Sequence, residues 1–576
     1  MTPMRRLGIS SVAALAVIVA GCVSTFDYDA TRNPEAERAG TAYGAFLAAQ
    51  YAGRVAERDA ASSYFRDAME AAPDDPYLVE RAFTSALTNG DLDEAARLAE
   101  LTLGDPSSDR LARVLLASRA VKDRRFQRAV DLLADTELGP FNRVVGSLVL
   151  AWAYEGLGDS DAALSALSAP GDAPILGHLM TLHRALVLER AGRQSEADAA
   201  YQAALESGLM RYLVVEAYGR RLERDGREAE ARALYAAQLA DFPADPAAQR
   251  GLQRIEEGRR PDAFAATPAQ GASMAVFAPA ATLASSSPSE LAVIYLRLAL
   301  YLDPENGAAR QLLGDLLSRL DLDREALTVY GDAEDGSPFY VSSKIAEAWT
   351  LLRLGEDDQA LASLNDLVDD VDEPTTRRAL ADSYRAVERY GDAYAIYDAL
   401  VEEAEAARGQ ADWELYYARA ITLERTGSWE LAEADFLRAL QIVPNEAQVL
   451  NYLGYTWVDR GVNLERAFGM IRRAVVLAPD SGFIVDSLGW AYFKRGEFDT
   501  AVGHLERAVE LDPQDPTINE HLGDAYWRVG RQLEASYQWR RALTLEPDDE
   551  TRIAIEAKLE TGLPTIEASP QAFADP

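Results

Sequence analysis

The feature that most constrains this chain is a proline that recurs at nearly equal intervals in its last third. The prolines of this series are Pro444, Pro479, Pro513 and Pro547. Proline ends a helix, because it lacks a backbone N–H and its ring clashes with the preceding turn. A fixed period, here about 34 residues, is typical of repeat arrays, in which each unit buries its apolar face against its neighbours. The sequence therefore predicts an array of helical units here.

Between these prolines the same pattern of small and large residues returns three times. In the middle unit, Gly489 and Ala501 are expected where two helices cross, because small side chains let the backbones approach closely. Tyr492 and Leu505 fill the space beside them, and Gly496 falls in the turn between the helices. The corresponding residues of the other two units are Leu453-Gly454, Trp457, Ala467, Ile471 and Ala474, and Leu522-Gly523, Tyr526, Ala535, Trp539 and Ala542.

This pattern resembles the tetratricopeptide repeat, a helix–turn–helix unit of about 34 residues. The resemblance implies an all-α fold, a superhelical α-solenoid of helical hairpins. Weaker copies occur upstream, for example between Pro304 and Pro338 and around Phe65–Pro73. We expect about a dozen hairpins in all. A degenerate unit can also be a generic amphipathic hairpin, which leaves the architecture unchanged.

Composition divides the array. Residues 258–288 are rich in Ala, Pro and Ser, which indicates a linker or an irregular segment. They separate an N-terminal, degenerate array (41–257) from a C-terminal array (289–560). The final segment, 561–576, contains Gly562, Pro564 and Pro570, and we expect it to be a disordered tail.

The N-terminus has the pattern of a cleaved signal peptide, residues 1–21. Two arginines precede an apolar run of about fourteen residues, shorter than the roughly 20 that span a bilayer. The run ends in Val19-Ala20-Gly21-Cys22, which resembles the lipobox of bacterial lipoproteins. The resemblance implies that Cys22, the one cysteine of the chain, is lipidated and begins the mature protein. The alternatives are an ordinary signal peptide with an incidental cysteine, or a buried cysteine.

Residues 22–40 are expected to be a lipidated tether, since they show no clean helical period before the array begins. Acyl chains contribute about 0.8 kcal/mol per buried CH₂, so several of them would hold the protein on a membrane. Val23, not aspartate, follows the cysteine. By resemblance to enterobacterial sorting, this favours the outer membrane, with the protein facing the periplasm. The inner membrane is the alternative.

Charge and composition exclude several function classes. The formal net charge is −36, whereas nucleic-acid binding needs a concentration of Lys and Arg. One cysteine permits neither an intramolecular disulfide nor a CxxC motif. His-Glu-x-x-His, Gly-x-Ser-x-Gly, Ser-x-x-Lys and phosphate-binding glycine loops are absent from the sequence. His178 and His183 are five residues apart, which does not place both on one helical face, and we interpret them as structural or surface residues. We expect no enzyme, no metal and no cofactor.

The chemistry that remains is a protein-binding groove. In tetratricopeptide units the first helix lines the inner surface, and the resemblance carries its inward positions onto the last three units. Aromatic side chains beside charges of both signs suit a site that anchors a peptide or a partner helix. The alternative is that Trp490 and Trp527 pack against adjacent repeats. The predicted groove residues are Asn451, Tyr455, Asp486, Trp490, Phe493, Lys494, Glu520, Asp524, Trp527 and Arg528.

Residues 290–550 and the lipobox are similar to a proteobacterial family of outer-membrane tetratricopeptide lipoproteins. The segments that carry the similarity are Tyr295–Leu300, Asp486–Tyr492 and His521–Trp527. The family includes a periplasmic adaptor that binds a carboxyl-terminal processing protease and helps it degrade cell-wall hydrolases. The resemblance implies a membrane-anchored adaptor. An assembly factor for polysaccharide export or outer-membrane biogenesis is the alternative, and a hydrolase with an unrecognised site is the third hypothesis.

Overall fold

A computed structural model describes most of the chain, and the described part is helical. The described residues are 34–54, 57–104, 108–134, 136–168, 174–208, 210–286 and 289–564. They form 30 helices and no strand, which confirms the predicted all-α class and the array of helical hairpins. The predicted signal peptide, Cys22 and the tail beyond residue 564 lie outside the described residues.

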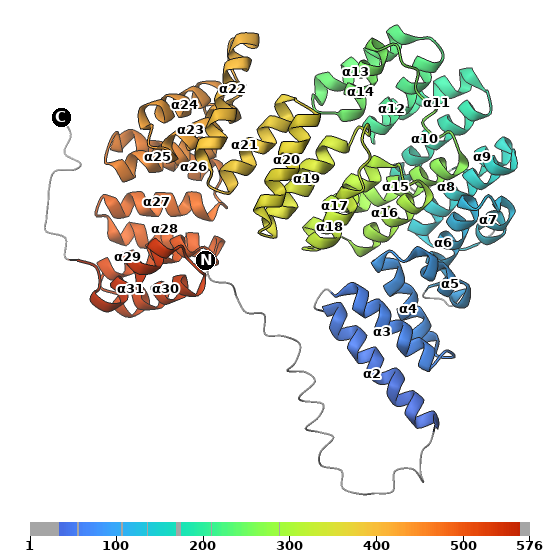
Figure 1. Ribbon diagram of the computed structural model, residues 1–576, viewed down its shortest axis with the longest axis horizontal. Coiled ribbons are helices and arrows are strands. Elements are labelled where there is room, and N and C mark those ends of the chain that lie inside the picture. Colours follow the sequence, from blue (N-terminus) through green and yellow to red (C-terminus); the bar gives the residue numbers. More distant parts are fainter. Residues whose placement is uncertain are drawn as a thin grey trace, which may run out of the picture. The chain divides into compact units, whose positions relative to one another are not determined.

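The chain divides into two compact units after Leu354. Unit 1 ends at this residue, and its helices are coloured blue to yellow-green in Figure 1. These helices are α2 (Pro34–Arg54), α3 (Arg58–Ala71), α4 (Pro76–Asn89), α5 (Leu92–Thr102), α6 (Asp109–Lys122), α7 (Phe126–Leu133), α8 (Pro140–Leu157), α9 (Ser160–Ala166), α10 (Pro174–Arg190), α11 (Gln194–Ser207), α12 (Arg211–Arg224), α13 (Glu228–Asp241), α14 (Pro246–Glu256), α15 (Pro268–Ser286), α16 (Glu290–Leu302), α17 (Gly307–Arg319), α18 (Asp323–Gly331) and α19 (Tyr340–Arg353).

Unit 2 begins at Gly355 and contains the more regular hairpins, coloured yellow to red in Figure 1. Its helices are α20 (Asp357–Asp370), α21 (Pro374–Ala386), α22 (Tyr390–Arg408), α23 (Trp413–Arg425), α24 (Trp429–Ile442), α25 (Ala447–Arg460), α26 (Leu464–Leu477), α27 (Gly482–Lys494), α28 (Phe498–Leu511), α29 (Pro516–Arg528), α30 (Gln532–Thr544) and α31 (Asp549–Thr561).

A glycine on the first helix and a large side chain on the second hold the two helices of a hairpin together. A Cβ added to Gly489 of α27 would stand 2.6 Å from Cγ of Leu505 on α28, so only glycine allows this approach. Gly496, between the helices, has φ of 78°, a left-handed conformation that glycine adopts without strain. The predicted crossing is therefore confirmed. The same close approach, at the same spacing along the sequence, pairs Gly219 with Tyr235, Gly314 with Tyr330 and Gly523 with Trp539.

Hairpins of unit 2 pack mainly on their neighbours in sequence (Figure 1). The second helix of one hairpin packs on the first helix of the next, as α26 does on α27 and α28 on α29. The first helices α25, α27 and α29 also pack on one another, more closely than the second helices α24, α26 and α28 do. The first helices therefore lie on the inner side of this stack, as the repeat register predicts.

Unit 1 differs from expectation at residues 258–288, where the sequence predicts a linker. The structure has α15 there, which packs on α6, α8, α10 and α16. Ala272 and Val276 are 0% exposed and Phe277 1%, so α15 belongs to the core. The Ala-, Pro- and Ser-rich composition wrongly suggested a linker, because a helix that is buried on all sides needs no polar face and shows no amphipathic period. The two units consequently divide after Leu354 and not at 258–288.

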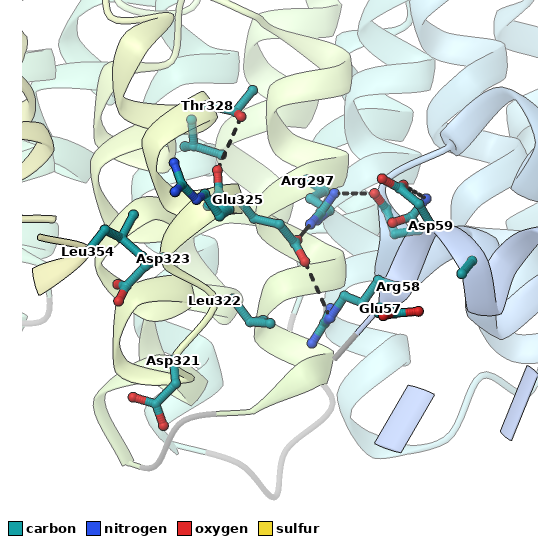
Figure 2. A pocket seen from close by; sticks show the side chains of 14 residues that line it. Glu57, Arg58, Asp59, Arg297, Asp321, Leu322, Asp323, Glu325, Thr328 and Leu354 are labelled. Carbon is teal, nitrogen blue, oxygen red and sulfur yellow. Dashed lines mark hydrogen bonds and ion pairs between the residues drawn. The ribbon is translucent and has the colours of Figure 1, made fainter. Parts of the chain in front are cut away.

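Unit 1 also contacts itself over long distances in the sequence. Helix α16 packs on α4 and α6, which lie about two hundred residues earlier. Arg297 of α16 donates to the main-chain carbonyl of Asn89 and, at 2.5 Å, to the carboxylate of Glu325 on α18 (Figure 2). Nε of Arg58 on α3 lies 3.5 Å from the same carboxylate. These bonds tie the first hairpins of unit 1 to α16 and α18.

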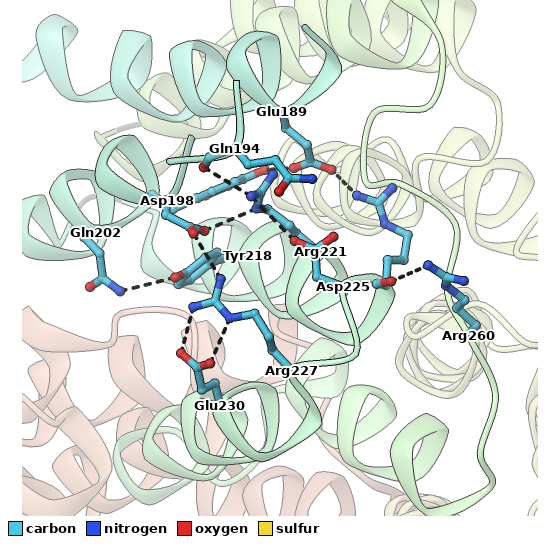
Figure 3. Close-up of polar contacts among 12 residues, drawn as sticks. Glu189, Gln194, Asp198, Gln202, Tyr218, Arg221, Asp225, Arg227, Glu230 and Arg260 are labelled. Atoms are coloured by element: carbon cyan, nitrogen blue, oxygen red, sulfur yellow. Dashed lines mark hydrogen bonds and ion pairs between the residues drawn. The ribbon is translucent and has the colours of Figure 1, made fainter. Parts of the chain in front are cut away.

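An ionic network joins the hairpin α10–α11 to the hairpin α12–α13 (Figure 3). Arg221 of α12 is buried, and its guanidinium lies 3.3 Å from Asp198 of α11 and 3.5 Å from Asp225. Arg227 donates to Asp198 at 3.0 Å and to Glu230 at 2.7 Å. A buried guanidinium is costly unless opposite charge surrounds it, so the network favours one register between the hairpins.

The predicted tether, residues 22–40, overlaps the first described helix at residues 34–40, which are helical. Residues 22–33 lie outside the described part, and α2 begins at Pro34. At the other end α31 extends to Thr561, one residue beyond the predicted limit of the C-terminal array.

Candidate protein-binding surface

The ten predicted groove residues lie on α25, α27 and α29, the first helices of three successive hairpins. Because these helices pack on one another, their inner faces form one surface. The structure divides the ten residues into two groups. The residues of the first group lie around Trp490. Those of the second group contact α31 or the residues that follow α31.

Trp490 lies at the centre of the first group. Its ring stacks on Phe493, with centroids 4.7 Å apart and planes at 5°, and on His521 of the next hairpin, at 4.0 Å and 12°. The ammonium of Lys494 lies 5.3 Å from its ring centroid. The indole N–H is buried and donates to no group in the described part of the chain. Trp490 therefore packs against the adjacent repeat, as the alternative interpretation has it, and is only partly exposed.

Asp486 is buried and directed at the imidazole of His521, whose Nδ1 lies 2.9 Å from the carboxylate. Burial lowers the pKa of His521, but the carboxylates of Asp486, Asp524 and Glu520, Asp486 most of all, together raise it, so that the net shift is upward. A protonated His521 under the Trp490 ring is a cation–π arrangement, which stabilises both the charge and the position of the indole.

Tyr455 and Asn451 add polar atoms from α25. Burial, together with the carboxylates of Asp486, Asp459 and Glu520, raises the pKa of Tyr455 to about 12. The hydroxyl thus stays protonated at neutral pH. Asn451 is buried, and its side-chain oxygen accepts no hydrogen bond within the described structure. An enclosed, unsatisfied acceptor of this kind favours a buried water as its donor.

Lys494 supplies an exposed positive charge at the edge of this group. Its ammonium lies 3.5 Å from Asp459, and both side chains are exposed. An exposed pair contributes about 0–1 kcal/mol, so a partner carboxylate can replace Asp459 at little cost.

The second group differs from what the sequence predicts. Lys558 of α31 donates to Glu520 at 2.6 Å and to Asp524 at 2.7 Å. Asp524 is buried and also accepts from the indole N–H of Trp539 at 2.9 Å. The terminal helix therefore neutralises both acids, and neither is free for a partner. The same contact joins Tyr330 to Asp315 at 2.7 Å and Tyr397 to Asp382 at 2.6 Å, each 15 residues apart, so this acid is a packing residue.

Trp527 and Arg528 lie beneath the end of the described chain. Trp527 packs on Trp539, with ring centroids 5.4 Å apart, and Gly562 lies against its other edge. Arg528 donates to the main-chain carbonyl of Pro564 at 2.7 Å. Residues 562–564, which follow α31, thus lie against the last hairpin, and the open part of the described surface is the part around Trp490.

Sequence reasoning missed Asp459, His521, Lys558 and Phe483. Asp459 contacts Lys494, Asp486 contacts His521 and Asp524 contacts Lys558, and the two members of each pair lie one repeat apart in the sequence. Charges one repeat apart are therefore the signal that could have found these pairs. Phe483 is exposed and lies seven residues before Trp490, on the same side of α27. It extends the apolar part of the surface.

A second recess lies within unit 1, where the first hairpins meet α16 and α18 (Figure 2). Its volume is about 690 Å³. Charges of both signs line it, including Arg58, Arg297, Asp323 and Glu325. Two of these carboxylates already pair with arginines, Glu325 with Arg58 and Arg297, and Asp323 with Arg353. The recess is thus a salt-bridged seam, and its chemistry favours no particular ligand.

Within the described residues, no cluster of three or more His, Cys, Asp or Glu side chains has the arrangement of a metal site. None of the described helices combines the length and the apolar character needed to cross a membrane.

Comparison with known proteins identifies repeats in unit 2. Residues 378–447 match the model of the tetratricopeptide repeat, and residues 489–530 match a second model, described as TPR repeat. A TPR repeat-containing protein of Pseudomonas aeruginosa is 33% identical over 90 residues, which are 16% of this chain and 15% of the relative. The chain thus matches about 15% of the length of this curated relative.

Solved structures of similar arrangement include the Cut9–Hcn1 hetero-tetramer of the APC/C, with 17% identity over 84% of this chain and 95% of the other, at a TM-score of 0.38. A TPR protein of Thermus thermophilus is 23% identical over 33% of this chain and all of its own, at a TM-score of 0.29. The two matched segments of unit 2 are tetratricopeptide repeats, a type that generally serves as a non-catalytic scaffold for protein interactions.

Proposed function

We propose that the mature protein is a membrane-anchored scaffold that binds another protein through the inner surface around Trp490. The observation that carries the proposal is the Trp490 cluster itself. It combines a stacked aromatic pair with an exposed ammonium at Lys494. Aromatic anchors with adjacent charge often contribute most of the binding energy of an interface.

The chemistry suits a peptide or a helix that presents an apolar side chain next to a carboxylate. The apolar side chain would pack on Trp490 and Phe483, and the carboxylate would replace Asp459 at Lys494. By its resemblance to the outer-membrane lipoprotein family, the protein would recruit a carboxyl-terminal processing protease and its cell-wall hydrolase substrates. Holding both on one surface raises their effective concentration without new contacts between them.

Anchoring through Cys22 is part of the proposal. The support is the lipobox and the absence of any other cysteine from the sequence. A Cys22→Ser variant should lose fatty-acid labelling and move from the membrane fraction to the supernatant. Persistent labelling of that variant would contradict lipidation at this position.

Affinity capture from solubilised membranes, with the mature protein as bait, tests the binding surface. We expect Trp490→Ala combined with Lys494→Ala to weaken the affinity for the captured protein at least tenfold, about 1.4 kcal/mol. Arg528 is left intact because it binds the chain at Pro564. Tyr537→Ala is the matched control, since Tyr537 is an exposed aromatic on a second helix, α30.

Circular dichroism separates lost binding from lost folding, because the double variant should keep its helical content. If the folded double variant captures the same partner with unchanged affinity, the surface around Trp490 is not the binding site.

A further inference from the structure

Helix α2, the first described helix of the chain, has an apolar face that no other described element covers. Its other face packs on α3, where Ala42 and Ala49 are buried. Tyr43, Leu47 and Tyr51 follow one another at four-residue intervals, which places them on one side of the helix. Their exposures are 65%, 48% and 69%. A row of three large apolar side chains in water is unfavourable unless another surface covers it.

The two ends of the array differ in this respect. The last helix, α31, buries Ile555 and exposes a single large apolar side chain, Ile553, among the charged residues Arg552, Glu556 and Glu560, so its outer face is mostly polar, as expected of a terminal repeat. On α2 the exposed residues from Gly40 onward include no carboxylate. The sequence itself has no Asp or Glu between Glu37 and Glu57, in a chain with 93 of them.

The position of α2 in the chain indicates what covers this face. Only the short segment 23–33 separates Cys22 from Pro34, where α2 begins. A fully extended chain spans at most about 3.6 Å per residue, so α2 begins within about 40 Å of the proposed acyl chains. Of the described helices, α2 is thus the nearest to the anchor along the chain.

The charge and the side-chain types of this face also suit contact with a lipid surface. A chain of net charge −36 is repelled from anionic headgroups, so close approach favours a face without carboxylates. Tyrosine places an apolar ring and a polar hydroxyl at the level where a bilayer changes from hydrocarbon to water, and it is enriched at membrane interfaces. Leu47 lies between the two tyrosines and would reach slightly deeper.

We propose that the face of α2 formed by Tyr43, Leu47 and Tyr51 lies on the lipid surface, as a second, non-covalent contact beside the acyl anchor. This inference rests on the proposed lipidation of Cys22. The second contact orients the first hairpin of unit 1 against the membrane, whereas the acyl anchor by itself would not fix its orientation.

Fluorescence quenching tests the contact in the full lipidated chain. Cys22 is the one cysteine of the sequence, so after its acylation a Leu47→Cys variant carries a single free thiol. The thiol is labelled with a polarity-sensitive dye, and the protein is reconstituted in vesicles of phosphatidylethanolamine and phosphatidylglycerol. A second vesicle set contains brominated phosphatidylcholine as quencher. Leu157→Cys is the matched control, because Leu157 is also in unit 1 and is 46% exposed.

We expect the dye at residue 47 to shift to the blue and to lose at least half of its emission in brominated vesicles, while the dye at residue 157 changes little. Equal quenching at both positions would overturn the proposal. A blue shift at residue 47 that brominated lipid does not quench, and that grows with protein density, would show a second copy of the chain on this face and would overturn it as well.

The number of dyes bound per chain distinguishes a failure of the proposed lipidation of Cys22 from a failure of the proposed α2 contact. Two dyes per chain would mean that Cys22 is free and that the proposed anchor is wrong. The variant Cys22→Ser with Leu47→Cys then carries one dye, and the same vesicles are added to it in solution. Quenching by brominated lipid would uphold the α2 contact without the anchor, and its absence would overturn both.

Discussion

Units 1 and 2 are made from similar hairpins but hold together differently. In unit 2 each hairpin packs on the hairpins next to it in sequence, and both segments that match repeat models lie there. In unit 1 the helix α15 packs on α6 and α8, more than a hundred residues earlier, and α16 packs on α4. Unit 1 therefore contains the non-local contacts of a globular domain, whereas unit 2 behaves as a nearly one-dimensional stack.

The difference predicts how far the destabilisation caused by a local defect extends in each unit. In a stack, a local defect weakens one hairpin and its immediate neighbours. In unit 1, a defect at α15 affects helices that are far apart in the sequence, because this helix contacts α6, α8, α10, α16 and α17. Three predictions test this comparison, in order of decreasing expected effect.

Truncating a buried tryptophan should destabilise many helices of unit 1 but only the neighbouring helices of unit 2. Trp152 of α8 is fully buried, packs against Gly271 of α15 and donates to Nδ1 of His183 at 3.0 Å. Trp539 is equally buried in the last hairpins. Each change to alanine should cost about 3–5 kcal/mol. By hydrogen exchange, Trp152→Ala should deprotect α6, α8, α15 and α16 together, and Trp539→Ala only α29 to α31.

If the exchange in Trp152→Ala rises only around α8, the two units do not differ in cooperativity. Circular dichroism of both variants serves as the control that the remaining helices are intact.

Replacing the glycine at a helix crossing by leucine should lower the free energy of unfolding by the same amount in both units, because this contact lies within one hairpin. Gly489→Leu in unit 2 and Gly314→Leu in unit 1 would each force the two helices apart, at about 1–3 kcal/mol. Gly503→Leu is the control, since Gly503 is also helical but a Cβ there meets nothing within 4 Å. Urea denaturation measures the three values. An unchanged midpoint for Gly489→Leu would show that the close approach to Leu505 tolerates a larger residue.

The two units should respond to pH with opposite sign, through one histidine each. Burial lowers the pKa of His183 to about 3, so acidification below about 6.5 favours unfolded chains that bind the proton, and unit 1 loses stability. For His521 burial lowers the pKa, but the carboxylates of Asp486, Asp524 and Glu520 together outweigh burial and raise it. The stability that the protonated His521 contributes is complete below about pH 6.5 and is lost as the pH rises through its folded pKa.

The slopes are at most about 1.4 kcal/mol per pH unit for one proton. Urea denaturation between pH 5.5 and 8, followed by hydrogen exchange in each unit, measures them. His183→Gln should remove the acid-side loss in unit 1, and Asp486→Asn the alkaline loss in unit 2. Equal slopes of the same sign in both units would contradict the assignment of these two groups.

The candidate surface was predictable in part. The repeat register places the ten residues on the inner helices of three successive hairpins, and the exposure of Lys494 agrees with it. The repeat register did not predict that the Asp524 carboxylate is already paired within the chain. It accepts hydrogen bonds from Trp539 in the same hairpin and from Lys558 in the next helix. Identifying a free carboxylate requires knowing every neighbour, and a spacing rule supplies only one of them.

The sequence by itself determined the helical class, the hairpin period and the crossing of Gly489 with Leu505. These depend on contacts within about one repeat, where the spacing of small and large side chains fixes which atoms meet. The tertiary structure alone decided that α15 is a core helix and that Arg297 reaches Asn89. Those outcomes depend on how the hairpins of each unit curve around one another. That curvature is a sum of small packing angles over many hairpins, and no single stretch of sequence specifies it.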